Sequence, residues 1–115
     1  MKDTEKMQII TDEVCGYLGL TESQIHCKSR KRELVEARQF IFYFSRKYTM
    51  LSLRQIGIPW GMNHDNIIYS CNTIDNLRVC NGYKTKYEYL NGVLHHKLPK
   101  FEWNLDKAAV SMSQM

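Results

Sequence analysis

The chain lacks any apolar run near the roughly 18–20 residues that a membrane-spanning helix needs. Its N-terminal segment, MKDTEKMQIITDEV, contains acidic residues throughout and has no apolar core of the kind found in a secretory signal. These two absences predict a cytoplasmic protein with no membrane partner.

Metal and nucleotide motifs are also missing. The chain has four cysteines, but no C-x-x-C pair, and none lies near a histidine at zinc-finger spacing: Cys15, Cys27, Cys71 and Cys80. We therefore expect reduced, partly buried thiols and no metal site. No glycine-rich phosphate loop of the G-x-x-x-x-G-K-[ST] type occurs, so we expect no nucleotide or other cofactor.

A concentrated basic segment is present instead. The 115 residues have a net charge of +4, with 43% hydrophobic and 24% charged residues, which is ordinary for one globular domain. Residues 28–47 contain seven basic and two acidic side chains, so the rest of the chain is close to neutral. A basic segment on a near-neutral body suits a polyanionic partner, although such runs are often only solvated surfaces.

Apolar residues recur at helical spacing along most of the chain, which predicts an all-α fold, a compact bundle of six to seven helices. Two S/T-x-x-Q capping boxes, at Thr21 and Ser52, predict the starts of short helices. The segment ELVEARQFIFYFSRKYT is apolar nearly all round, which is typical of a central helix. The expected helices cover residues 5–18, 21–25, 33–49, 52–57, 63–79 and 83–90.

Glycines and prolines predict where these helices end. Gly57 ends the short helix that starts at Ser52, and Asn81-Gly82 and Asn91-Gly92 are typical stops. We expect residues 1–27 to form lead-in helices and residues 28–98 the core with its C-terminal helix. Residues 99–115 lack periodicity and are expected to form a flexible tail.

A short capped helix, a glycine turn and a longer helix with a polar first turn predict a helix-turn-helix, whose second helix enters the DNA major groove. That first turn is Asn63, His64, Asp65 and Asn66, whose side chains can face base edges. Asn63 and Asp65 are also good N-cap residues. A catalytic His64–Asp65 pair is disfavoured, because adjacent side chains on a helix diverge by about 100°. We therefore expect no enzyme.

At these positions the chain resembles the C-terminal DNA-binding domain of the DnaA chromosomal replication initiators. A basic connector, SRKR at 29–32, precedes EARQ at 36–39, where the family has an A-R-Q element. The spacing R-x-x-T-x-x-S-L-x-x-I-G is present from Arg46 to Gly57, followed by the aromatic Trp60. GMNHDNI at 61–67 takes the place of the family signature G-R-D-H-T-T-V. The resemblance covers about residues 7–80.

The chain departs from this signature at the residues that face DNA. Only Gly61 and His64 are retained; the other DNA-facing positions hold Met62, Asn63, Asp65 and Asn66, and one glycine before the signature is missing. The resemblance therefore does not carry over the family's DnaA-box preference. Asp65 would also repel a nearby phosphate.

The resemblance implies a role for each matching residue. Arg30 matches the arginine that enters the minor groove, with Lys31 and Arg32 beside it. Arg38 and Gln39 match phosphate-contacting positions, and Ser52 and Leu53 begin a helix whose backbone N–H groups can hold another phosphate. The alternative for Arg38 is a surface ion pair with Glu33 or Glu36.

The function that the sequence predicts is sequence-preferring binding of double-stranded DNA, resembling origin recognition by replication initiators but without their ATPase module. Because the lead-in begins at Met1, we expect a stand-alone protein. The alternatives are a piece of a larger initiator, or a regulator of transcription or replication of a phage or mobile element. The alternative from another class is a protein-interaction adaptor that holds its partner through Trp60, Met62 or the tail of residues 99–115.

Overall fold

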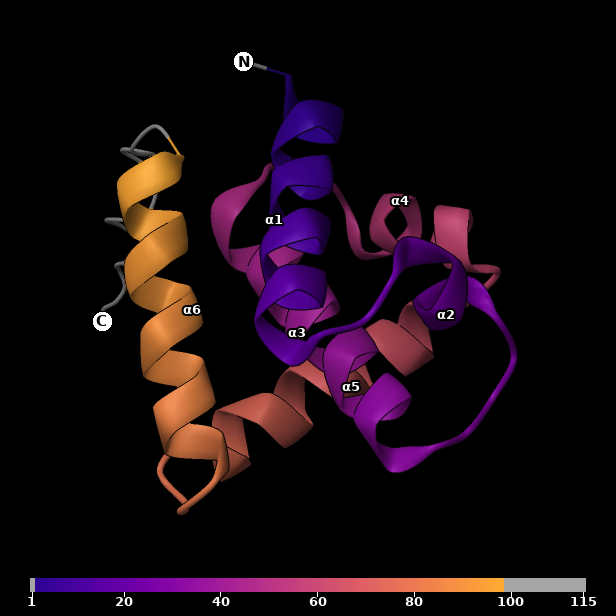
Figure 1. Cartoon of the computed structure of the whole chain (residues 1–115). Coiled ribbons are helices and arrows are strands. Elements are labelled where there is room, and N and C mark those ends of the chain that lie inside the picture. The colour runs from indigo at the N-terminus through magenta and orange to yellow at the C-terminus, as the bar shows by residue number, and fades with distance from the viewer. Residues whose placement is uncertain (1, 99–115) are drawn as a thin grey trace.

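Helix α3 (Arg32–Tyr48) lies at the centre of the molecule in the computed structural model, which describes residues 2–98 (Figure 1). No side chain between Leu34 and Ser45 is exposed. Phe40, Phe42 and Phe44 are all fully buried, although their side chains leave the helix in different directions. A helix buried in this way needs neighbours on several sides.

Those neighbours are the other helices of an all-α fold, as predicted. Helices α1 and α5 make the most extensive contacts with α3, and α2 and α4 also pack against it. Besides α3, the described residues form the helices α1 (Asp3–Leu18), α2 (Glu22–His26), α4 (Leu53–Gly57), α5 (His64–Leu77) and α6 (Tyr83–Lys97). They also form one 3₁₀ turn, η1 (Ile58–Trp60), and no strand.

Both predicted capping boxes are present. The Thr21 hydroxyl accepts a hydrogen bond from the Gln24 backbone N–H (3.1 Å), and the Gln24 side chain accepts one from the Thr21 backbone (2.8 Å). Ser52 and Gln55 repeat this arrangement at the start of α4, with distances of 3.1 and 2.9 Å. Two orphan N–H groups are satisfied at each start, so even helices of five residues have defined ends.

Helix α6 is longer than the sequence predicts. Asn91 and Gly92 were expected to break it, but the helix continues to Lys97. The Asn91 side chain explains the difference, because its Oδ1 accepts hydrogen bonds from Lys47 Nζ (2.9 Å) and Tyr48 OH (2.7 Å) on α3. These tertiary contacts offset the low helix propensity of an Asn-Gly pair, which is about 1 kcal/mol for glycine relative to alanine.

The connection into α6 also differs from the prediction. Helix α5 ends at Leu77, before the expected stop at Asn81-Gly82. Gly82 has a positive φ of 91° and directly precedes α6, so it serves the start of that helix.

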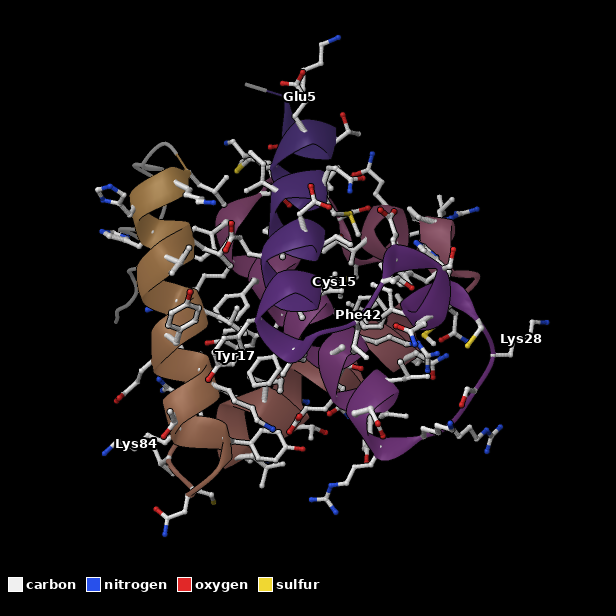
Figure 2. All side chains as sticks on the ribbon, viewed as in Figure 1. Glu5, Cys15, Tyr17, Lys28, Phe42 and Lys84 are labelled. Atoms are coloured by element: carbon white, nitrogen blue, oxygen red, sulfur yellow. The ribbon has the colours of Figure 1, made fainter. Side chains whose placement is uncertain are left out.

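Helix α6 is fastened to α1 as well as to α3. The rings of Tyr17 and Tyr89 stack with centroids 4.5 Å apart, and Figure 2 shows Tyr17 between the two helices. Lys97 pairs with Glu13. Burial raises the pKa of the Tyr48 phenol to about 12, with Tyr87 adding to the shift, so the hydroxyl stays protonated and can donate to Asn91.

Cys15 and Cys71 are buried, whereas Cys27 and Cys80 are exposed, and all four are free thiols. Burial raises the pKa of the Cys15 thiol to about 11, which keeps it protonated and unreactive at neutral pH. Among residues 2–98, no helix combines the length and apolar content that a membrane crossing requires. The predicted tail at 99–115 lies outside the described residues.

We predict that Asn91→Ala lowers the free energy of unfolding by about 1–3 kcal/mol, because Lys47 and Tyr48 lose a partly buried acceptor. Without these contacts the substitution would stabilise α6, since alanine is the better helix former. Urea unfolding followed by circular dichroism measures the change. The control Asn81→Ala, at an exposed asparagine, should stay within about 0.5 kcal/mol of the parent. Equal stability of both variants and the parent would refute the role of Asn91.

Candidate nucleic-acid interface

The turn between α4 and α5 depends on the close approach of two backbone segments. The Met62 backbone N–H donates to the Gly57 carbonyl over 3.0 Å. A Cβ placed on Gly57 would lie 2.3 Å from the Met62 carbonyl oxygen, so only glycine fits there. Gly61 has a φ of 66°, a left-handed conformation that also favours glycine. The two glycines set the direction in which α5 leaves the turn.

Trp60 anchors this turn to the rest of the protein. Its ring packs edge-on against Phe42 of α3, with centroids 5.6 Å apart. On another side the ring stacks on His26, the last residue of α2, with centroids 3.9 Å apart and planes 12° from parallel. The start of the basic connector, at Cys27, therefore lies beside the turn that leads into α5.

The first turn of α5 stands in solvent with its polar side chains. Asn63 is the N-cap, and its Oδ1 accepts a hydrogen bond from the Asn66 backbone N–H over 3.1 Å. The capping alternative for Asn63 is therefore confirmed, whereas Asp65 lies inside the helix. Asn63, His64, Asp65 and Asn66 are all exposed. Ile67 and Ile74 are buried in the core, which fixes this polar turn on the outer side of the helix.

His64 and Asp65 pair, contrary to the prediction that their side chains diverge. His64 Nε2 lies 3.3 Å from Asp65 Oδ1. The expectation was wrong because it followed only the Cα–Cβ directions, whereas rotation about the χ angles brings the two groups together. The side chains are 61% and 77% exposed, so solvent screens the pair and its contribution to stability is small. When the imidazole is protonated, it offsets the Asp65 charge locally.

The exposed face of α5 extends beyond the residues that the sequence singled out. Tyr69, one turn after Asp65, is 68% exposed. Asn72 and Asn76 continue on the exposed surface. The helical spacing from Asp65 to Tyr69 and Asn72 could have indicated this surface, since residues three and four apart share one helix face.

The connector between α2 and α3 carries its cations into solvent. Arg30, Lys31 and Arg32 are exposed, and Figure 2 shows the neighbouring Lys28 pointing away from the protein. Lys31 is the N-cap of α3, and its backbone N–H donates to the Ser29 hydroxyl over 3.2 Å. The predicted DNA contacts of these residues stay predictions, since they require a nucleic acid to be present.

Arg38 is placed differently from these cations. The side chain is 8% exposed, and its guanidinium donates to the carbonyl oxygens of Ile25 (2.7 Å), Cys27 and Ser29 (2.9 Å). Glu36, one of the two carboxylates considered as its partner, instead pairs with Lys86 of α6 at 2.7 Å. The phosphate contact of Arg38 stays a prediction. Three of the five guanidinium N–H groups already donate to carbonyl oxygens, so only the other two could donate to a phosphate.

Of the remaining predicted contacts, Gln39 lies in the middle of α3, whereas Ser52 and Leu53 lie at the start of α4. Gln39 is half-buried on α3, Ser52 is exposed, and Leu53 packs partly against the core. The Ser52 hydroxyl already accepts the Gln55 N–H, which leaves its own proton for a further acceptor.

The surface proposed for a protein partner is largely covered. Trp60 and Met62 are both partly buried and pack against the hydrophobic core. An adaptor was expected to expose an apolar patch at these two residues, and the structure offers none there. The 99–115 tail, the other part of that prediction, lies outside the described residues. Within the described part of the chain, no three potential ligands gather into a metal site.

Comparison with known proteins identifies one family. The family model described as "Bacterial dnaA protein helix-turn-helix" matches residues 7–74, which include most of α1, all of α2 to α4 and most of α5. The chain is 35% identical over 86 residues to the chromosomal replication initiator protein DnaA of Bacteroides thetaiotaomicron, covering 73% of the chain and 18% of that protein. No solved structure gave a significant match.

Two further relatives carry the same description. The DnaA of a Synechococcus species is 38% identical over 71 residues, covering 61% of the chain and 15% of that protein. The DnaA of Flavobacterium psychrophilum is 38% identical over 65 residues, covering 56% and 14%. The chain therefore spans less than a fifth of the length of these relatives.

We predict that Gly57→Ala destabilises the protein by about 1–3 kcal/mol, because the added methyl group forces the Met62 carbonyl away. The matched control is Gly92→Ala in α6, where a Cβ meets nothing within 4 Å. That substitution should stabilise the protein by about 0.5–1 kcal/mol, since alanine is the better helix former. Chemical unfolding of both variants measures these opposite signs, and a stabilised Gly57→Ala variant would contradict the close approach.

Proposed function

This chain belongs to the bacterial DnaA protein helix-turn-helix family, and we propose that it binds double-stranded DNA with a sequence preference. The observation that carries the proposal is the exposed polar first turn of α5, held by an α4–α5 turn that packs beside the start of the basic connector. In this proposal α5 enters the major groove and the connector follows the adjacent backbone and minor groove.

The first turn of α5 has the chemistry for base recognition. A major groove about 12 Å wide admits a helix and presents both hydrogen-bond donors and acceptors. His64 and Asn66 can donate and accept, and Asp65 can accept from a cytosine amino group. Asn63 uses Oδ1 for its cap and can offer its amide N–H groups to a base. The N-terminal end of α5 also carries a partial positive charge that faces the phosphates.

The connector and α3 would position the protein on the DNA backbone. Arg30 can insert into a narrow minor groove, where the negative potential is strongest. Lys31, Arg32 and Gln39 can contact phosphates on either side of that groove. At the start of α4, the Ser52 hydroxyl and the backbone of Leu53 can hold another phosphate. These contacts would set orientation, and those of α5 would set sequence preference.

The biological setting follows from the relatives, which are named chromosomal replication initiators. We propose that the chain acts at a replication origin or a related regulatory site, in the compartment that holds the chromosome. The proposal concerns DNA binding and not the other activities of those longer proteins. Since Met62, Asn63, Asp65 and Asn66 replace the family's signature residues, its preferred site should differ from a DnaA box.

We predict that the affinity for duplex DNA falls linearly on a log–log plot against salt concentration, with a slope of about −3 to −6 for a few phosphate contacts. Fluorescence anisotropy at several salt concentrations measures the slope. Arg30→Ala should make it shallower by about one unit. Lys84→Ala, on the opposite side of the molecule from Lys28 (Figure 2), removes the same charge and should leave it unchanged. Binding that does not depend on salt, or no binding to any duplex, would overturn the proposal.

His64→Ala should change which sequences are bound. Loss of a base contact should cost about 1–3 kcal/mol at one base pair and leave the affinity for other sites nearly unchanged. Selection of bound duplexes from a random pool, with the parent and the variant in parallel, shows the altered position. His96→Ala, at an exposed histidine on α6, is the matched control and should select the same sites as the parent. If the parent and both variants selected identical sites, the proposed contact between His64 and a base would be refuted.

A further inference from the structure

The guanidinium of Arg38 faces the connector from inside the protein. Its Nε–H and both terminal nitrogens donate to three carbonyl oxygens of alternate residues, at Ile25, Cys27 and Ser29. Two of these distances are 2.7 and 2.9 Å, within the range of charge-assisted hydrogen bonds. One side chain of α3 thus holds the end of α2 and the first part of the connector.

Arginine is suited to this task. A guanidinium is planar and carries five N–H donors in a rigid fork, so it can serve several acceptors at once. A lysine ammonium is a point charge on a flexible stem and does not reproduce that fork. Burial of a charged group is costly unless hydrogen bonds satisfy it, and the three carbonyl oxygens do so here. Because the donors of the guanidinium match the three carbonyl acceptors, we interpret this contact as a specific structural restraint on the connector.

The connector has few other restraints. Among the described residues, the backbone–backbone hydrogen bonds outside the helices include none from residues 28–30. Its beginning is fixed by the His26–Trp60 stack, and its end by Lys31 as the N-cap of α3. Between these two points, Arg38 fixes Cys27 and also Ser29, which immediately precedes Arg30.

We propose that Arg38 is a positioning residue, which acts on DNA through the connector by holding Arg30 and its neighbouring cations in a preformed arm. The inference rests on the proposed DNA binding and deepens it. An arm ordered before DNA arrives does not lose its conformational freedom on binding, which favours affinity. Because His26 stacks on Trp60, the same restraint fixes the arm relative to the first turn of α5.

Limited proteolysis without DNA tests the restraint itself. Trypsin cleaves after lysine and arginine, and the connector offers four such exposed sites between Lys28 and Arg32. Arg38→Lys and Arg38→Gln should both raise the initial rate of cleavage there by about tenfold, because local opening exposes the chain to the protease. Arg54→Lys, at an exposed arginine of α4, is the matched control and should leave the rate unchanged. Equal rates for all variants and the parent would overturn the proposal.

The affinities of the Arg38 variants for the duplex pool distinguish a positioning role of Arg38 from a direct contact with phosphate. If Arg38 contacted phosphate as a point charge, Arg38→Lys would keep most of the affinity and the salt slope. We expect Arg38→Lys instead to lose about tenfold in affinity, as Arg38→Gln does. The effect of Arg30→Ala should then shrink in the Arg38→Lys background, because the two residues act as a unit. Full rescue by lysine, or strictly additive losses, would contradict the proposal.

A measurement on the parent protein decides the matter if the Arg38 variants do not fold. The Nε–H resonance of Arg38 should exchange slowly with solvent before DNA is added and move little when a duplex is titrated. Fast exchange in the absence of DNA would overturn the proposal. Failure of the parent to bind any duplex would refute the proposed function, while the proteolysis and exchange results would still test the restraint.

Discussion

The burial of α3 on all sides is the constraint on which the other elements depend. From Leu34 to Ser45 no side chain of this helix is exposed, so the chain has to cover it from several directions. Helix α1 and helix α5 lie against it, and the short α2 and α4 also contact it. The position of α5, and therefore of its exposed first turn, is fixed by the apolar residues that it shares with α3. A candidate reading surface thus rests on an apolar core rather than on a loop.

A helix buried all round also encloses polar side chains, and most of those on α3 have partners, although the buried Ser45 hydroxyl has none among the described residues. Glu36 meets Lys86 at 2.7 Å, Tyr48 meets Asn91 at 2.7 Å, and Arg38 meets three connector carbonyls. Unsatisfied polar groups in the interior would be destabilising, so these contacts are demanded by burial. These polar contacts fix the positions of α6 and of the basic connector, which the apolar core alone does not determine.

The cations of the basic segment, residues 28–47, fall into two groups: some are exposed to solvent, and others are bonded to partners within the protein. The sequence shows seven basic side chains within residues 28–47 and does not distinguish among them. In the structure, Arg30, Lys31 and Arg32 face solvent, while Arg38 and Lys47 are directed to partners within the protein. Of the five exposed cations in this segment, four lie in the connector and the fifth is Arg46.

Local patterns in the sequence determined the all-α class, both capping boxes, the apolar stripe of α5 and the helix-turn-helix, because these depend on residues a few positions apart. Tertiary structure decided the partners of Arg38 and Trp60 and the length of α6 past Asn91. The donors on Arg38 lie 9 to 13 residues from their acceptors, and Asn91 lies more than 40 from Lys47 and Tyr48. Periodicity does not encode such distances; they follow from packing around α3, which decides which polar groups meet.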